Sequence, residues 1–165
     1  MNVVDYLKPG QRLFVAGSSN EPTGLLARLK AVDLPADLHF VQFPLAGYNR
    51  EDFTGYAPDA RFTTFFMTPH LKAADPARLR FLPMQMRRVY DYVAANTDVA
   101  LVQVARDADG RLRLGPNVDF VEAALDSASM VLAELNTSFV APAGCPLVDE
   151  ARLDAVVETE RPLAE

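Results

Sequence analysis

Residues 98–136, DVALVQVARDADGRLRLGPNVDFVEAALDSASMVLAELN, decide the fold of this 165-residue chain. The stretch opens with a nearly continuous apolar run, Val99 to Val104, bounded by polar residues on both sides. Such a run is typical of a strand that is buried on both faces of a sheet. A second apolar run, Met130 to Leu135, closes the stretch and predicts a second buried strand.

The segment between these two runs predicts a turn, a short strand and a helix. The turn is expected at residues 107–110, where Asp109-Gly110 suits the positive φ of a hairpin, and the short strand at residues 111–114. Asn117 is a good helix N-cap, and apolar residues then recur at helical spacing, at Val121, Ala124, Leu125 and Ala128. Strand, excursion, helix and strand in this order predict a parallel α/β sheet.

The other expected elements are a short helical turn at 3–7, strands at 12–16, 38–43, 61–68 and 153–158, a helix after residue 22 and a helix at 84–96. The helix after residue 22 should bury Leu25, Leu29 and Val32, and the helix at 84–96 should use Met86, Val89, Tyr90 and Val93 for packing. The segment 71–83, which contains several prolines and basic residues, is expected to be a surface loop or lid.

Composition limits the class of protein. With 165 residues, half of them hydrophobic, the chain can bury one ordinary core and is expected to form a single domain. A net charge of −6 and the lack of any basic run argue against a nucleic-acid or anionic-membrane partner. One cysteine, Cys145, cannot form an internal disulfide, and neither a leader nor a membrane-spanning apolar run is present. The sequence therefore predicts a soluble, cytoplasmic protein.

The chemistry-bearing residues form no recognisable catalytic set. His39 lies inside a strand and is expected to be hydrogen-bonded in the core, whereas His70 lies in a loop with no Cys, Ser or carboxylate at a catalytic offset. The sequence contains no Cys/His cluster, no phosphate loop and no nucleophile elbow, so we expect no metal and no covalently bound cofactor.

The loop at residues 17–22, GSSNEP, is the most suggestive local feature. Its small residues would let a ligand approach the backbone, and the N–H groups at the following helix start favour anionic or carbonyl oxygens. A plain tight turn with a Ser or Asn cap is the alternative explanation of the same residues.

Eight short segments occur in a characteristic order: LKPGQRLFV at 7–15, EP at 21–22, DVALVQV at 98–104, DG at 109–110, LGPNVD at 114–119, VLAELN at 131–136, LDAVVE at 153–158 and RPLAE at 161–165. In this order and spacing they resemble the N-terminal half of the acetyl-CoA hydrolase/transferase family, which includes 4-hydroxybutyrate and acetate CoA-transferases. No single segment is specific, but the series covers nearly the whole chain.

The resemblance implies an open, mainly parallel α/β sheet with flanking helices, of the CoA-transferase (NagB/RpiA-like) type. Residues 1–158 would form the N-terminal domain, and residues 159–165 a linker towards a missing C-terminal domain. In the family a glutamate of the C-terminal half attacks the acyl-CoA thioester, and the resulting glutamyl-CoA thioester passes CoA to a carboxylate or to water. The resemblance therefore implies coenzyme A thioesters and a small carboxylate as substrates, and no catalytic residue in this chain. The implied partner is the C-terminal half or a second subunit, with a homodimer as a further option.

Two glutamates could be mistaken for the nucleophile. Glu21 lies at a helix start, where it is expected to be a cap or a loop brace, and Glu134 lies in a buried strand, where it should be paired. Some family members carry a histidine near the position of Gly17, and the glycine here suggests room for a differently shaped acyl group. Loops at strand ends are expected to contact substrate through Gly17, Ser18, Ser19, Asn20, Glu21, Gly47, Gly115 and Asn117.

Three functions remain open at this point. Half of a CoA-transferase or acyl-CoA hydrolase would show no turnover alone. It would expose an apolar patch where the second half docks, or form a dimer that covers this patch. A stand-alone acyl-CoA-binding or assembly domain would instead present a polar surface there. A sugar-phosphate or nucleotide-binding enzyme would need a basic residue beside residues 17–20, and that loop contains neither Lys nor Arg.

Overall fold

The structure, a computed structural model, describes residues 3–163. Its helices are the 3-10 helices η1 (Val3–Tyr6), η2 (Ser18–Asn20), η3 (Phe53–Gly55), η4 (Pro69–Ala73) and η5 (Glu150–Arg152), and the α-helices α1 (Thr23–Lys30), α2 (Met86–Ala95) and α3 (Val121–Ser127). Its strands are β1 (Arg12–Val15), β2 (His39–Gln42), β3 (Arg61–Thr64), β4 (Leu79–Phe81), β5 (Val99–Arg106), β6 (Leu112–Leu114), β7 (Met130–Asn136) and β8 (Ala155–Thr159).

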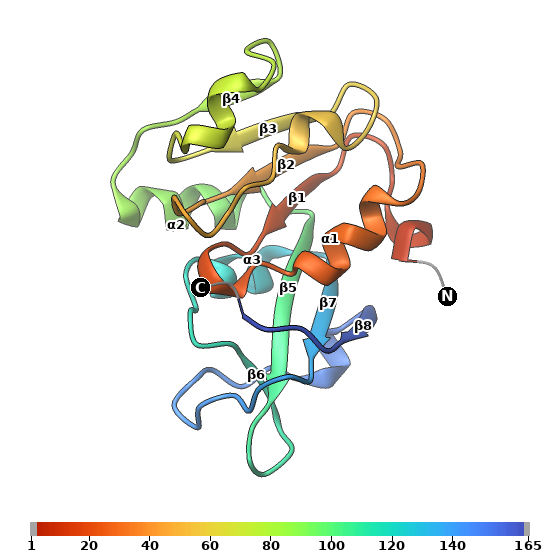
Figure 1. Ribbon diagram of the computed structural model, residues 1–165, viewed down its shortest axis with the longest axis vertical. Coiled ribbons are helices and arrows are strands. Elements are labelled where there is room, and N and C mark those ends of the chain that lie inside the picture. Colours follow the sequence, from red (N-terminus) through yellow and green to blue (C-terminus); the bar gives the residue numbers. More distant parts are fainter. Residues whose placement is uncertain (1–2, 164–165) are drawn as a thin grey trace.

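These strands form one sheet in the order β4-β3-β2-β1-β5-β7-β8, with β6 paired to β5 outside this path (Figure 1). All strand pairs are parallel except β5 with β6. Helix α1 covers one face of the sheet, and α2 and α3 cover the other. The predicted open, mainly parallel α/β sheet with flanking helices is therefore confirmed.

The stretch at residues 98–136 folds largely as its pattern predicts. Strand β5 is buried along its whole length except for Arg106, and it pairs with β7 in register from Val99↔Met130 to Val104↔Leu135. The turn between β5 and β6 uses Gly110 at φ +81°, a conformation that glycine adopts without strain.

The prediction that Asn117 caps the third helix is wrong. Helix α3 begins at Val121, its N-cap is Phe120, and no side chain caps it. Asp119, two residues before the helix, has a left-handed backbone with φ +47°, which is incompatible with a helix that starts at residue 118. The conformation of this loop depends on contacts with distant residues, which no local pattern records.

Two further expectations need correction. The segment 71–83 is not only a loop, because it contains the edge strand β4, which pairs with β3 from Phe62↔Leu79 to Thr64↔Phe81. This strand has only three residues and no buried side chain, so it lacks the apolar pattern that identifies strands. On α2, Val89 and Val93 are buried as expected, whereas Met86 and Tyr90 are exposed, and Val32 lies exposed beyond the end of α1.

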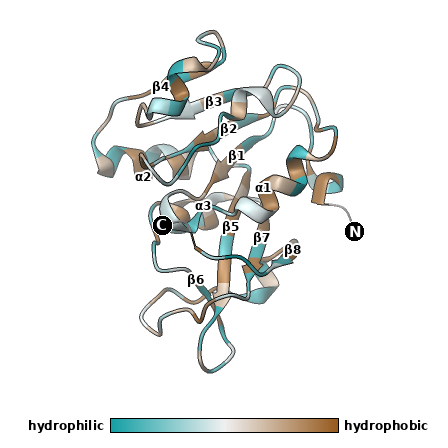
Figure 2. Cartoon of the chain, in the orientation of Figure 1, coloured by the Kyte–Doolittle hydropathy of each residue, from teal (hydrophilic) through white to brown (hydrophobic). Residues whose placement is uncertain are grey.

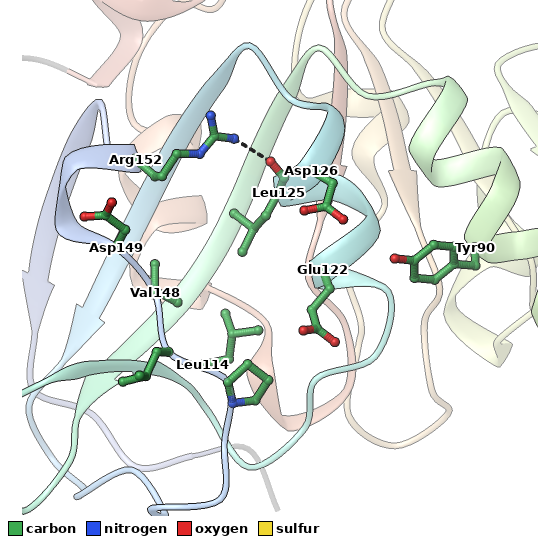
Figure 3. Close-up of a pocket in the computed structure, with 10 residues that line it drawn as sticks. Tyr90, Leu114, Glu122, Leu125, Asp126, Val148, Asp149 and Arg152 are labelled. Atoms are coloured by element: carbon green, nitrogen blue, oxygen red, sulfur yellow. Dashed lines mark hydrogen bonds between the residues drawn. The ribbon is translucent and has the colours of Figure 1, made fainter.

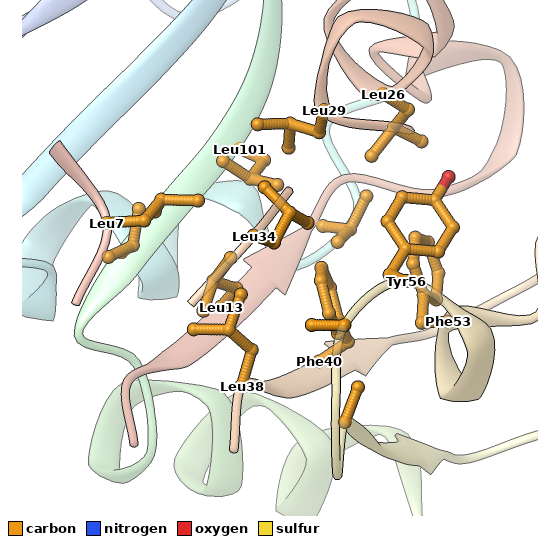
Figure 4. Close-up of a cluster of buried hydrophobic side chains, with 14 of the residues drawn as sticks. Leu7, Leu13, Leu26, Leu29, Leu34, Leu38, Phe40, Phe53, Tyr56 and Leu101 are labelled. Carbon is orange, nitrogen blue, oxygen red and sulfur yellow. The ribbon is translucent and has the colours of Figure 1, made fainter. Parts of the chain in front are cut away.

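The sheet separates two hydrophobic clusters, and alternate residues of its central strands enter each one. Figure 2 shows hydrophobic residues along the central strand β5. On the α1 face, Leu13 and Leu101 pack with Leu26, Leu29 and an aromatic group around Phe40 and Phe53 (Figure 4). On the α2/α3 face the neighbouring strand residues, such as Phe14 and Ala100, pack against Val89 and Val121. This alternation explains the continuous apolar runs, because a strand covered on both faces has no solvent-facing side.

His39 has the structural position expected from its strand. Its Nε2 atom lies 2.7 Å from Thr63 Oγ1 on the neighbouring strand β3.

Among residues 3–163, no helix is long and apolar enough to cross a membrane.

The strand order reverses between β1 and β5. From β1 the chain moves outward through β2 and β3 to the edge strand β4, and it then returns to place β5 on the opposite side of β1. In open α/β sheets, ligands bind in the crevice outside the carboxyl ends of the two strands at which the order reverses. The topology therefore places the candidate site at the end of β1, beside β5, where the loop that follows β1 meets the loop that follows β6.

Candidate functional site at the carboxyl ends of β1 and β5

Two loops meet at this point of the sheet. A Cβ atom added to Gly115 would lie 1.9 Å from Asn20 Oδ1, and one added to Gly17 would lie 3.3 Å from Asp119 Oδ2. The loop at 17–22 therefore packs directly on the loop at 115–120, and only glycine at Gly115 permits so close an approach. The structure thus brings together two of the segments that the sequence singled out separately.

Gly17 does not leave extra room for an acyl group, so that interpretation of the glycine is wrong. A Cβ atom on Gly17 would lie 2.4 Å from the backbone oxygen of Phe43, at the end of β2. The space beside Gly17 is filled by the Phe43 backbone and by the carboxyl group of Asp119. Glycine at this position is a requirement of packing between the two loops.

A third loop, which follows β2, is tied to the first by Asn49. Asn49 Oδ1 accepts hydrogen bonds from the backbone N–H groups of Ser18 (2.8 Å) and Leu45 (2.9 Å), and Asn49 Nδ2 donates to the Ser18 carbonyl oxygen (3.1 Å). Ser18 has φ +54°, a conformation that residues other than glycine rarely adopt. Asn49, which is buried, compensates for this strained backbone and holds the loop in one shape.

The predicted substrate contacts occupy two different depths. Buried behind the surface are Gly17, Ser18, Asn20, Glu21 and Gly115. Nearer the solvent are Ser19, Asn117 and Gly47, the last of which has φ +92° at an exposed turn. Contact between any of these eight residues and a substrate stays a prediction.

Behind the loop at 17–22 lies a buried chain of hydrogen bonds that begins at Arg161. Its Nε donates to Glu134 Oε1 (2.6 Å), and its Nη2 donates to Gln103 Oε1 and to the carbonyl oxygen of Glu21 (2.7 Å each). Gln103 Nε2 in turn donates to Asn20 Oδ1 (3.0 Å). The segment at 159–165, predicted to be a linker, is therefore attached to the loop up to Arg161, and residues 164 and 165 lie outside the described part of the chain.

Glu134 has the structural role predicted for it. Its Oε2 accepts a hydrogen bond from the backbone N–H of Leu25 (2.9 Å), and its Oε1 also accepts from Thr159 Oγ1 (2.7 Å). Leu25 lies in the first turn of α1, whose N-cap Pro22 offers no side-chain acceptor. A carboxylate at the N-terminal end of a helix satisfies free N–H groups and interacts favourably with the helix dipole. Glu134 thus supplies the missing cap from strand β7.

Glu21 braces the loop, as predicted, through a hydrogen bond from Gln42 Nε2 to its Oε1 (2.8 Å). It is 4% exposed, and burial raises its pKa from the ordinary 4.5 to about 7. The hydrogen bond from Gln42 lowers the pKa, but by less than burial raises it. Glu21 is therefore largely protonated in the folded chain at mildly acidic pH.

Asp119 is a titratable residue beside the site that the sequence prediction omitted. It is partly buried, and burial raises the pKa of its carboxyl group from 3.8 to about 6. Within residues 3–163 its carboxyl oxygens take part in no hydrogen bond or ion pair with the protein. No local pattern singled it out, because both its burial and its position beside Gly17 depend on a loop one hundred residues away in the sequence.

Gln42 and Gln103 were also omitted, although the sequence held a signal for them. Each is an amide inside an otherwise apolar strand, in LHFVQF and VALVQV. A buried amide must find hydrogen-bond partners, so such a residue marks a buried polar cluster. Both are fully buried, and both point to the α1 face, where they support the loop at 17–22.

The rim of the site is apolar. The Phe43 ring lies 5.1 Å from the rings of both Phe66 and Phe120, measured between centroids. We call the exposed apolar residues that follow β2 and β3 the edge patch; they are Leu45 (38% exposed), Tyr48 (39%), Phe66 (53%) and Met67 (40%). These residues lie at the same end of the sheet as the loop at 17–22, since all three segments follow parallel strands.

A groove of about 440 Å³ lies between α2, α3 and residues 146–152 (Figure 3). Its apolar floor includes Leu114 and Val148, and its walls carry Glu122, Asp126 and Asp149. The one cation in its lining, Arg152, donates to the carbonyl oxygen of Leu125. Three carboxylates repel an anionic ligand, so this groove is a poor site for an acyl-CoA. None of the predicted site residues lines it.

A family model, described as the acetyl-CoA hydrolase/transferase N-terminal domain, matches residues 1–158 of this chain. A search of curated proteins found no match.

The fold also resembles solved structures. RipA from Yersinia pestis is similar with a TM-score of 0.81 and 20% identity, over 98% of this chain and 42% of that chain. A 4-hydroxybutyrate CoA-transferase from Porphyromonas gingivalis has a TM-score of 0.63 and 21% identity, over 99% of this chain and 38% of that chain. The chain thus spans about two fifths of the length of these neighbours.

A variant of the decarboxylase AibA/AibB, in which one cysteine is replaced by serine, has a TM-score of 0.68 and 16% identity. Here the alignment covers 95% of this chain and 80% of that chain. The same fold therefore also occurs in a chain of nearly this length.

Substitution of Gly115 by alanine should distort the contact between the two loops. The new methyl group would occupy the position of Asn20 Oδ1 and break its hydrogen bond with Gln103. We expect the free energy of unfolding to fall by about 1–3 kcal/mol in urea titrations, as in other overpacked sites. G144A is the matched control, because nothing lies within 4 Å of a Cβ atom there. Equal effects of the two substitutions would contradict the proposed packing.

Substitution of Arg161 by methionine should leave Glu134, which is fully buried, as an unpaired charge. We expect a loss of about 3–5 kcal/mol in the free energy of unfolding, and faster hydrogen exchange at Ser18 and Leu25. E134Q in the R161M background should recover part of the loss. R106M, which breaks the exposed Arg106–Glu150 pair, should cost less than about 1 kcal/mol. Similar losses for R161M and R106M would show that the buried pair does not hold the loop.

Stability should fall as pH rises from about 4.5 to 7, in part because of Glu21. Its pKa is higher in the folded chain, so in this window the folded state binds a proton that the unfolded state has released. E21Q should remove this component, worth up to about 3 kcal/mol, and flatten the curve of unfolding free energy against pH. E122Q, at an exposed site on α3, is the control and should leave the curve unchanged. Identical curves for E21Q and the unsubstituted chain would contradict the raised pKa.

Proposed function

The chain belongs to the acetyl-CoA hydrolase/transferase family, of which it carries the N-terminal domain, and from this premise we propose that it forms one wall of the substrate cleft of an acyl-CoA:carboxylate CoA-transferase. The same role applies if the enzyme is an acyl-CoA hydrolase, in which water replaces the acceptor carboxylate. The nucleophilic glutamate comes from a C-terminal half or a second subunit.

The observation that carries this proposal is the convergence of two loops at the point where the strand order reverses. The loops at 17–22 and 115–120 touch through Gly115 and Asn20, and they present Ser19 and Asn117 towards the solvent. Hydroxyl, amide and backbone N–H groups bind the oxygen atoms of a thioester or a carboxylate by hydrogen bonds. A crevice of this kind at the carboxyl end of a parallel sheet is the usual ligand site of the fold class.

The buried glutamates of this chain are poor nucleophiles, which supports a nucleophile from elsewhere. Glu134 is fully buried and accepts hydrogen bonds from Arg161, Thr159 and the Leu25 N–H group. Glu21 is buried behind the loop and accepts from Gln42. A carboxylate that attacks a thioester must reach the substrate carbonyl, and neither side chain has that freedom.

In the proposed reaction, the partner's glutamate attacks the thioester carbonyl, and the thiolate of CoA leaves. The acyl-glutamyl anhydride is then attacked at its glutamyl carbonyl by the CoA thiolate, which releases the first carboxylate and leaves a glutamyl-CoA thioester. The acceptor carboxylate then attacks the glutamyl-CoA thioester and displaces the CoA thiolate, which gives a second anhydride. The thiolate attacks the acceptor's carbonyl in this anhydride, which forms the new acyl-CoA and releases the glutamate. In this scheme the domain described here binds and orients the acyl group and excludes water from the cleft.

The edge patch supports docking of a second half. Its four large apolar side chains are 38–53% exposed and lie beside the site loops, whereas a self-sufficient binding domain would present polar groups there. The loops at 17–22 and 115–120 contain no Lys or Arg, which disfavours a sugar-phosphate or nucleotide as the ligand of these loops. The half-enzyme proposal therefore fits the site better than either alternative.

A complementation experiment tests the proposal. The chain alone should show no CoA exchange between an acyl-CoA and a labelled carboxylate, and addition of a C-terminal half from the same source should restore exchange with ping-pong kinetics. A Glu→Gln variant of the nucleophile in that half should abolish exchange. F66E should weaken complementation because it places a charge in the edge patch, whereas K72E, at an exposed site on η4, serves as the control.

Either of two results would contradict the proposal. One is robust acyl-CoA turnover by the purified chain alone. The other is a correctly folded partner half that binds the chain and restores no exchange.

A further inference from the structure

We propose that Asp119 is a substrate-binding residue, which holds the carboxylate of the acceptor by donating a hydrogen bond to it as a neutral carboxylic acid. This inference deepens the proposed function and rests on it, because it takes a short aliphatic carboxylate as the ligand. It assigns a role to a residue that lies outside the predicted set of substrate contacts.

The first argument is position. Asp119 Oδ2 lies beside Gly17, at the contact between the two loops that follow β1 and β6. The backbone of Asp119 is left-handed, with φ +47°, and so is that of Ser18 in the facing loop, with φ +54°. Strained residues other than glycine persist where the surrounding structure holds them, and they concentrate at ligand sites. Two such residues lie in the two loops that pack together at the point where the strand order reverses.

The second argument is that the carboxyl group of Asp119 has unused hydrogen-bonding capacity. Among residues 3–163, no hydrogen bond from a protein donor to either of its oxygens is present, and the residue is only partly buried. A Cβ atom added to Gly17 would lie 3.3 Å from Asp119 Oδ2 and 2.4 Å from the Phe43 carbonyl oxygen, so the carboxyl group lies against the loop at 17–22. A partly buried carboxyl group that the protein itself leaves unpaired is available to a ligand.

Among residues 3–163, no ion pair compensates the charge of Asp119. Two titratable residues lie on the neighbouring loops: Glu21, which is buried and held by Gln42, and Tyr48, which is exposed after β2. Two more lie on α3, Glu122 and Asp126, and both line the groove. The loss of hydration is accordingly the cause that raises the pKa of Asp119 to about 6. The group therefore keeps a proton at pH values where an ordinary aspartate has lost it.

The third argument is the lack of cations in the surrounding loops. The segments at 17–22, 43–49, 65–68 and 115–120 contain no Lys or Arg. A carboxylate bound among these loops cannot form an ion pair with them, and two ionised carboxylates side by side repel each other. One proton shared between Asp119 and the ligand removes that repulsion. The rings of Phe43, Phe66 and Phe120 would pack against a short alkyl chain.

Nuclear magnetic resonance of the 165-residue chain tests this site, with butyrate as the probe and butyramide as its uncharged control. We expect Asp119 to titrate well above the ordinary aspartate range, and butyrate, but not butyramide, to raise its pKa further. Butyrate should shift the amide signals of Gly17 and Ser19. Its affinity should fall about tenfold for each pH unit above the pKa of Asp119, because the bound state requires the proton.

Three variants complete the test. D119N keeps a donor but cannot titrate, so it should bind butyrate with no pH dependence between pH 5 and 8, a window that spans the pKa of about 6. D119A should lose butyrate binding. D126N, at an exposed site on α3, should behave like the unsubstituted chain. The titration of the unsubstituted chain and the D119N result decide the matter even if D119A fails to fold.

The proposal is overturned if Asp119 titrates in the ordinary range, if butyrate leaves its pKa unchanged, or if D119N keeps the pH dependence. Failure of the proposed function is a separate outcome. If Asp119 binds butyrate as expected but complementation yields no CoA exchange, the CoA-transferase assignment fails and the carboxylate site stands. If exchange is restored and D119N leaves the KM for the acceptor and its pH profile unchanged, only the carboxylate site fails.

Discussion

The buried pair of Arg161 and Glu134 is the interaction on which the candidate site depends. Glu134 is fully buried, and a carboxylate in that position is tolerated only with compensating partners. Through this pair, strand β7, the N-terminal turn of α1 and the chain beyond β8 are held against the loop at 17–22. The pair therefore joins the last described residues of the chain to the loop that faces the proposed substrate.

This arrangement divides the polar residues into two groups with different tasks. Arg161, Gln103 and Asn20 lie behind the loop, where a chain of hydrogen bonds from Arg161 to Gln103 and from Gln103 to Asn20 Oδ1 fixes its shape. In front of the loop, Asp119 has no hydrogen-bond partner among residues 3–163. The loops around it contain no Lys or Arg. A rigid loop with unused hydrogen-bonding groups is suited to bind a ligand without reorganisation. A second protein half that covers the edge patch would complete such a site.

The candidate site was only partly predictable from the sequence. The GSSNEP loop at 17–22 and the LGPNVD segment were correctly identified as strand-end loops, because small and polar residues after apolar runs mark such loops. The structural roles of Glu21 and Glu134 were also predicted correctly, but those of Gly17 and Asn117 were not. Gly17 is required by the Phe43 backbone rather than by a ligand, and Asn117 is not a helix cap. Both errors arose because the deciding contacts come from segments distant in the chain.

The sequence by itself determined the class of the fold. Continuous apolar runs at Val99–Val104 and Met130–Leu135 specify strands covered on both faces, and Gly110 specifies the turn between β5 and β6. These features depend on neighbours in the chain, so their signal is local. Only the tertiary structure decided that Asp119 lies unpaired beside Gly17 and that Arg161 reaches Glu134. Burial and pairing depend on which distant segments lie at the same edge of the sheet. The order of the strands determines this, and no single segment of the sequence encodes that order.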